Sequence, residues 1–167
     1  MSRRARLLLN AGLFQLGWFA CVLGAQQPWL LLIALACLTI HLRWVAADRD
    51  EWRTLLYVAL CGWVLDSTLL HLGVFSFGDS TLLLPIWLAL LWLLFASTLL
   101  HSLNWTARPW WLGSLLGAVG GPLSYLGGAR LADVGLPLGV WPSVLLLGVI
   151  WAVLMPGVHW LIRWRTR

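Results

Sequence analysis

Long unbroken runs of apolar residues are the feature that most constrains this chain. About six segments carry few charges, and each has the roughly twenty residues that a helix needs to cross the hydrocarbon of a bilayer. Backbone polar groups in lipid must be paired within the protein, which leaves helices or a closed barrel. Barrel strands alternate apolar and polar residues, and these runs do not. The sequence therefore predicts an all-α integral membrane protein, a compact bundle of about six transmembrane helices.

Short polar or turn-forming segments separate the predicted spans. Only 10% of the residues are charged, against about 25% in soluble domains, so a water-soluble module is not expected. We therefore predict a single transmembrane domain over residues 1–167. Its spans lie near residues 7–25, 29–45, 52–75, 82–103, 109–131 and 138–164.

The basic residues predict the orientation of the chain. All eleven are arginine; ten are predicted on one side of the membrane and only Arg130 on the other. Arginine and lysine are enriched in cytoplasmic loops, so both termini are expected in the cytoplasm and the protein in the bacterial inner membrane. Because this charge flanks apolar spans, nucleic acid is not an expected partner. The other ten are Arg3, Arg4, Arg6, Arg43, Arg49, Arg53, Arg108, Arg163, Arg165 and Arg167.

The chain is rich in tryptophan and has a glycine-rich fifth span. Many of the 14 tryptophans fall at predicted span ends, which is typical of the aromatic belt at membrane interfaces. Small residues four apart allow helices to approach closely, so the fifth span should pack against several neighbours. Its two small-residue stripes are Gly113, Gly117 and Gly121, and Gly120, Ser124 and Gly128.

Asp66 is the carboxylate predicted deepest in the membrane, about fourteen residues into the third span. A charge at that depth costs a few kcal/mol or more, so an intramembrane acid is a functional candidate with a partner. Tyr125 and Ser124 reach a similar depth on the fifth span, and Arg130 could lean towards them. The alternative is that Asp66 only locks the third and fifth spans together.

Three histidines lie near the cytoplasmic ends of predicted spans. Imidazoles that converge there could form a metal site or an acid–base site. Alternatively, they only cap helix carboxyl ends at the headgroup level. The histidines are His41, His101 and His159, and nearby acids that could join them are Asp48, Asp50 and Glu51.

A polar stripe is predicted along the inner half of the fourth span. Ser97, Thr98, His101 and Asn104 recur at steps of three and four residues, so they should share one helix face. Such a stripe should face protein or water rather than lipid. The sequence has no serine-hydrolase elbow, P-loop, dinucleotide fingerprint or HExxH motif, so it supports neither a particular catalysis nor a cofactor.

Several motifs together resemble a known family. They are Asn10–Phe19, Leu65-Asp66-Ser67, Pro85–Trp92, Phe95–Trp105 with its His101-Ser102-Leu103, and Gly117–Tyr125. Over nearly the whole chain they resemble the bacterial domain-of-unknown-function 2878 family of small inner-membrane proteins. The resemblance implies the same membrane architecture. It also suggests a lipid-related role, because genes of this family occur among lipid-modifying enzymes such as cyclopropane-fatty-acid synthase-like proteins.

Three functions are compatible with these patterns. The first is the modification or handling of membrane lipid, and the second is a non-catalytic assembly subunit that docks to another inner-membrane protein or a lipid-modifying enzyme. The third is a small proton-coupled transporter in which Asp66 titrates. For the first, the candidate catalytic residues are Asp66, Tyr125 and His101, and the candidate ligand contacts are Arg130, Ser124, Ser67, Thr98 and Asn104.

Overall fold

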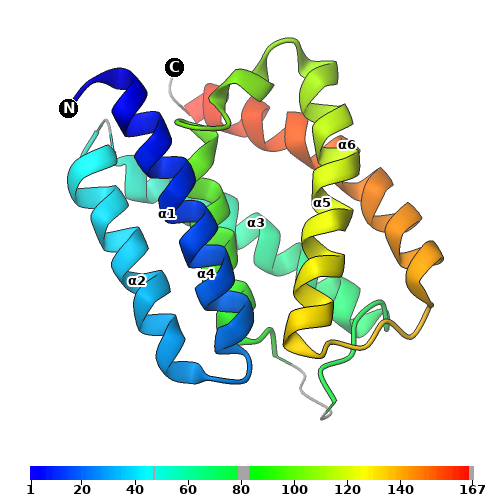
Figure 1. The fold of residues 1–167 in the computed structure, drawn as a ribbon. Coiled ribbons are helices and arrows are strands. Elements are labelled where there is room, and N and C mark those ends of the chain that lie inside the picture. Colours follow the sequence, from blue (N-terminus) through cyan, green and yellow to red (C-terminus); the bar gives the residue numbers. More distant parts are fainter. Residues whose placement is uncertain (47, 79–82, 166–167) are drawn as a thin grey trace. The chain divides into compact units, whose positions relative to one another are not determined.

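The computed structural model describes residues 1–46, 48–78 and 83–165, and within them the protein is all-α (Figure 1). The all-α prediction is confirmed. The short turns are η1 (Pro28–Leu30), η2 (His41–Val45, a π-helical turn) and η3 (Asn104–Ala107). The six α-helices of the described residues are α1 (Arg3–Gly24), α2 (Leu31–Ile40), α3 (Glu51–His71), α4 (Ile86–Leu99), α5 (Trp110–Ala132) and α6 (Val140–Arg165).

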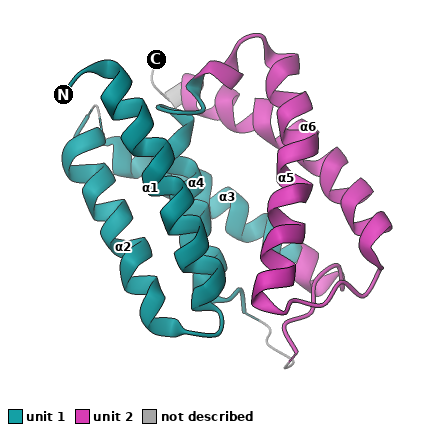
Figure 2. Cartoon of the chain, viewed as in Figure 1, with its two compact units in different colours: residues 1–68, 83–104 teal, residues 69–82, 105–167 magenta. Residues whose placement is uncertain are grey.

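The chain divides into two compact units, drawn in different colours in Figure 2. Unit 1 comprises residues 1–68 and 83–104, and therefore holds α1, α2, most of α3, and α4. Unit 2 comprises residues 69–82 and 105–167, and holds the end of α3 with α5 and α6. The single domain expected from the sequence stays a prediction.

In unit 1, α1 packs against both α2 and α4, which lie beside it in Figure 1. Glycines make some of these contacts close. A Cβ atom at Gly17 of α1 would lie 2.7 Å from the Leu94 side chain of α4, and one at Gly62 of α3 would collide with the Trp92 ring. Close packing of this kind replaces the hydrophobic effect as the main attraction between helices in lipid.

In unit 2, the main contact is between α5 and α6. One of the two small-residue stripes of α5 forms it: a Cβ at Gly117 would collide with the Trp151 carbonyl oxygen, and one at Gly121 with the Trp151 ring. Gly113 lies against the Thr106 carbonyl oxygen, 2.8 Å from a Cβ placed there. Gly120, from the other stripe, has no described atom within 4 Å of such a Cβ. The two stripes of α5 therefore have different surroundings.

Within the residues that the structure describes, four helical segments are long and apolar enough to cross a membrane. The helix in the fourth predicted span is short, because α4 has 14 residues, about 21 Å at 1.5 Å per residue, against roughly 30 Å of hydrocarbon. The glycine-rich α5 is not among the four. Crossings by α4 and α5 therefore stay predictions. The four segments are Arg3–Gly24, Pro28–Val45, Glu51–His71 and Val140–Trp164.

The helices found in two of the predicted spans begin or end at other residues than the spans do, for identifiable reasons. Pro85 has extended backbone angles, φ −58° and ψ 142°, so α4 begins only after it, and Leu82 lies outside the described residues. At the other end, the amides of His101 and Leu103 both donate to the Thr98 carbonyl and turn the chain away. The third span, predicted to reach residue 75, ends as a helix at His71.

The end of α3 is a Schellman motif. The Gly73 amide donates to the Leu70 carbonyl and the Val74 amide donates to the Leu69 carbonyl. This arrangement needs a left-handed residue, and Gly73 has φ 72°. The glycine therefore stops the helix four residues before the predicted end.

Candidate acid–base site

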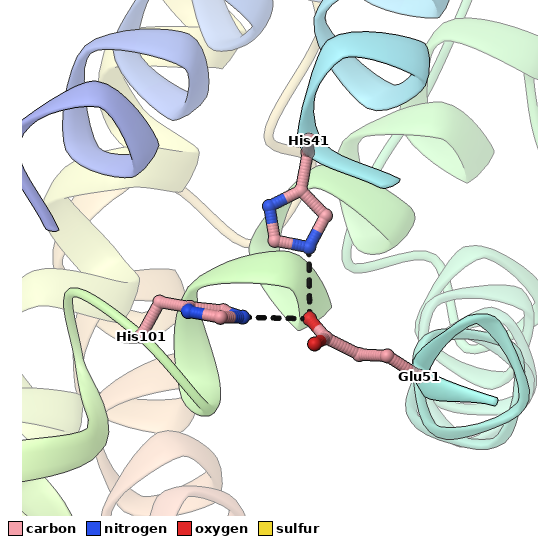
Figure 3. A group of neighbouring side chains, drawn as sticks. All are labelled: His41, Glu51 and His101. Carbon is pink, nitrogen blue, oxygen red and sulfur yellow. Dashed lines mark hydrogen bonds and ion pairs between the residues drawn. The ribbon is translucent and has the colours of Figure 1, made fainter. Parts of the chain in front are cut away.

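Three ionisable side chains meet in unit 1, as Figure 3 shows. His41 Nε2 lies 2.9 Å from Glu51 Oε1, and His101 Nε2 lies 2.8 Å from the same oxygen. Glu51 is 4% exposed and His41 is 1% exposed. An ionised carboxylate can accept hydrogen bonds but cannot donate them, so in each pair the imidazole nitrogen is the donor. The group is thus a buried carboxylate held by two imidazoles.

Each side chain reaches the site from the end of a helical element. His41 begins the π turn η2, in which the Ala46 amide bonds to the His41 carbonyl, and Glu51 is the first residue of α3. His101 lies in the turn just after α4. A helix amino terminus favours negative charge, so the position of Glu51 supports its carboxylate in addition to the two imidazoles.

Asn10 extends the group to α1. Its side chain is fully buried, and its amide nitrogen lies 3.2 Å from His41 Nδ1 and donates to the Ser97 carbonyl at 3.1 Å. Its amide oxygen accepts from the Ser102 amide at 3.1 Å and from the Ser102 hydroxyl at 2.6 Å. The network therefore joins α1, the end of α2, the start of α3 and the end of α4.

This arrangement resembles the part of a catalytic triad in which a carboxylate orients an imidazole. Glu51 holds His101 through Nε2, and no hydrogen bond to His101 Nδ1 is found among the described residues. His101 is also less buried than His41, with 9% of its side chain exposed. Its Nδ1 is therefore the nitrogen of this group that can exchange a proton with a substrate or water.

The same three residues are also a possible metal-ligand set. One ligand atom from each of His41, Glu51 and His101 can be chosen so that all lie within 4.8 Å of one another. Two histidines and one glutamate hold zinc in several hydrolytic enzymes. The distances alone therefore do not distinguish a metal site from a hydrogen-bonded acid–base site.

The three histidines predicted near the cytoplasmic span ends have different partners. It joins His41 and His101 through Glu51, whereas His159 Nε2 pairs with the Thr106 hydroxyl at 2.8 Å in unit 2. Asp50 is exposed and lies 3.5 Å from Arg53 on the surface. Of the three nearby acids, Glu51 is thus the one that enters the network.

Asp66 is fully buried in unit 1, and its Oδ2 accepts a hydrogen bond of 2.7 Å from Trp92 Nε1. Tyr125 belongs to unit 2, where its ring stacks on Phe75 and meets Trp151 edge to face. Asp66 is thus bonded to α4 of unit 1, whereas these ring contacts of Tyr125 are with residues of unit 2. That Asp66 and Tyr125 act together stays a prediction.

The remaining candidate ligand contacts have varied surroundings. The hydroxyls of Ser97 and Thr98 donate to carbonyls one turn earlier in α4, each at 2.6 Å. Asn104 is exposed and lies beyond the end of α4, so the predicted polar stripe does not continue on one helix. Arg130, near the end of α5, is also exposed. Ser67 and Ser124 are half-buried.

Asn10 is the residue that the sequence reasoning missed as part of a site. A signal for it exists, because Asn10, Leu13, Gly17 and Gly24 all lie on the buried face of α1. A polar side chain in register with apolar and small residues that face other helices must itself face protein. The residue could therefore have been singled out before its partners were known.

The described part of the chain is all-α and holds four helical segments able to cross a membrane, which defines the protein as an integral membrane protein. A family model described as "Protein of unknown function (DUF2878)" matches residues 7–157, nearly the whole chain. The chain belongs to the DUF2878 family, as its motifs suggested. No curated protein and no solved structure matches it.

Proposed function

We propose that this protein acts on a membrane lipid at the bacterial cytoplasmic membrane, with Glu51 and His101 as its acid–base pair. The observation that carries the proposal is the buried Glu51 carboxylate, which accepts hydrogen bonds from two imidazoles. A carboxylate of this kind orients a bound imidazole for proton transfer. A purely apolar helical scaffold has no need of such a group.

We place both termini and the acid–base site on the cytoplasmic side. Support comes from the ten arginines that flank the spans on one side, three of which lie in the segment between α2 and α3 or next to it. His41 lies in the last turn of one apolar segment, Pro28–Val45, and Glu51 begins the next. In this topology the site lies at headgroup level, where a lipid's polar group meets the membrane helices.

The chemistry available to His101 is general acid–base catalysis. Neutral His101 can accept at Nδ1 the proton of a lipid hydroxyl or of water as that oxygen attacks a lipid ester, while Glu51 stabilises the resulting imidazolium. The imidazolium can then return the proton to the alcohol that leaves as the ester C–O bond breaks. The choice of lipid as substrate is supported by the depth of the site and by the lipid-related role that the family resemblance suggests. Asp66 and Trp92 would then support the helices that carry the site.

Lipid analysis of complemented strains tests this proposal. A deletion strain would carry either the wild-type gene, Glu51→Gln or His101→Gln, with equal amounts of protein verified in the membrane fraction. We expect the wild type to restore a lipid species that both variants leave unrestored, because neither variant keeps the carboxylate–imidazole pair. Asp50→Asn is the matched control, since it removes an exposed acid next to Glu51 and should restore the lipid fully. Restoration by Glu51→Gln and His101→Gln would contradict the proposal.

A non-catalytic assembly subunit is the second candidate, because part of α5 offers a surface to a partner helix. A Cβ placed at Gly120 would have no described atom within 4 Å, and Val119 and Leu123 beside it are 53% and 63% exposed. An open glycine between apolar side chains permits close helix approach in lipid. Crosslinking in native membranes from Gly120→Cys would give a stoichiometric heteromeric product if this candidate is correct, and only lipid adducts or uncrosslinked monomer if it is not.

A further inference from the structure

The hydrogen bonds of Asn10 fix the orientation of its side-chain amide. The Ser102 backbone amide can only donate and the Ser97 carbonyl can only accept, so the first must face the Asn10 oxygen and the second its nitrogen. Rotating the amide by half a turn would break both bonds and bring like groups together. The orientation therefore follows from two backbone groups whose roles are unambiguous.

The fixed amide in turn fixes the tautomer of His41. Asn10 presents an N–H to His41 Nδ1 at 3.2 Å, so Nδ1 must accept and carries no hydrogen. A neutral imidazole has its hydrogen on the other nitrogen, and His41 Nε2 lies 2.9 Å from Glu51 Oε1. In the neutral ring Nε2 therefore carries the hydrogen, and His41 donates it to Glu51.

We propose that Asn10 holds His41 in the tautomer that donates from Nε2 to Glu51, so that the three residues form a hydrogen-bonded site in which His101 exchanges the proton, and not a metal site. His41 is then a positioning residue. The ionisable side chains placed against His101 are Glu51 on α3 and His41 on η2. This inference rests on the proposed acid–base function and specifies which of the two imidazoles exchanges the proton.

The same contacts argue against a metal ion at the three ligand atoms. Coordination through His41 Nε2 would remove its hydrogen, and a neutral ring would then carry a hydrogen on Nδ1. That hydrogen would point at the N–H of Asn10, which accepts nothing. Histidines that bind metals usually donate their second N–H to a carboxylate, carbonyl or water, and Asn10 offers the opposite partner.

Nitrogen NMR of histidine side chains tests the inference on the full-length protein. The protein would be labelled with ¹⁵N-histidine and purified in detergent, with the signals of the four histidines assigned from single His→Gln variants. We expect wild-type His41 to show a protonated Nε2 and a bare Nδ1, unchanged when Zn²⁺ is added. A protonated Nδ1 in the wild type, or a zinc-induced shift of His41 Nε2 that Glu51→Gln abolishes, would overturn the proposal.

Asn10→Asp supplies a second readout, because it keeps the shape of the side chain but replaces the donor by an acceptor. We expect His41 in this variant to carry a hydrogen on Nδ1. If the folded variant showed an Nδ1 without a hydrogen, the role given to Asn10 would be wrong. If the variant does not fold, the wild-type spectrum still decides the tautomer. Since these spectra involve no lipid, an unchanged lipid composition in the deletion strain would contradict the proposed function while leaving the tautomer result intact.

Discussion

Close glycine contacts occur within both units of this protein, but the helices of unit 1 also share a network of buried polar side chains. In unit 1, buried polar side chains connect the helices: Asn10, His41, Glu51 and His101 form one network, and Trp92 donates to Asp66 elsewhere. In unit 2, the main contact is steric, since glycines of α5 let α6 approach to the point where a methyl group would collide. Buried polar groups can also perform chemistry, whereas close glycine contacts only bring helices together. This difference is the reason for placing the proposed site in unit 1.

Glu51→Ala should have the largest effect on stability. Removing the carboxylate leaves two imidazoles without their shared acceptor, and breaking a buried pair in this way costs about 3–5 kcal/mol. The free energy of unfolding would be measured by SDS titration in mixed micelles. Asp50→Ala, at a surface ion pair of 3.5 Å, should change it by no more than about 0.5 kcal/mol. Equal effects of the two variants would show that the network does not hold unit 1 together.

Trp92→Phe should have the next largest effect, about 1.5–3 kcal/mol, because Asp66 loses a hydrogen bond of 2.7 Å from the indole in a buried setting. Trp63→Phe is the matched control. Trp63 donates to the Ala89 carbonyl and is only partly buried, so its loss should cost about 1 kcal/mol or less. A larger cost at Trp63 would indicate that ring packing, and not the bond to Asp66, decides the stability of α3 and α4.

Gly117→Ala tests the steric contact of unit 2. The added methyl group meets the Trp151 backbone carbonyl, which cannot move away as a flexible side chain could, so we expect a loss of about 1–3 kcal/mol. Gly120→Ala has open space around it and should be neutral or stabilise by up to about 1 kcal/mol, because alanine favours helix. SDS titrations of the two variants give the comparison directly. If Gly117→Ala were as stable as Gly120→Ala, close approach of α5 and α6 would not be what holds unit 2.

The sequence predicted more of the scaffold than of the site. Apolar runs identify spans because each helix must pair its own backbone, so the helical elements were found within a few residues. The end of α4 was missed because side-chain hydroxyls and a turn at Thr98 decide it. His41 and His101 could be placed at one end of the spans from antiparallel order alone.

Which acid joins the two histidines could not be deduced from the sequence. Asp48, Asp50 and Glu51 are close together in the chain, and only the start of α3 at Glu51 turns that side chain inward. The Glu51–imidazole bonds and the Asn10 contacts also link residues far apart in sequence. Such contacts depend on helix rotation and spacing, which apolar patterning specifies only coarsely.

Thr106→Val should have the smallest effect, and it asks whether unit 2 also depends on a polar contact. The Thr106 hydroxyl pairs with His159 Nε2 at 2.8 Å, and both residues are buried, so its loss should cost about 1 kcal/mol. Thr39→Val is the control, since the Thr39 hydroxyl only bonds back to the Leu35 carbonyl of its own helix at an exposed position and should leave the unfolding free energy unchanged. A loss at Thr106 as large as that at Glu51 would remove the distinction between the units, because the Thr106–His159 contact would then stabilise unit 2 as strongly as the network stabilises unit 1.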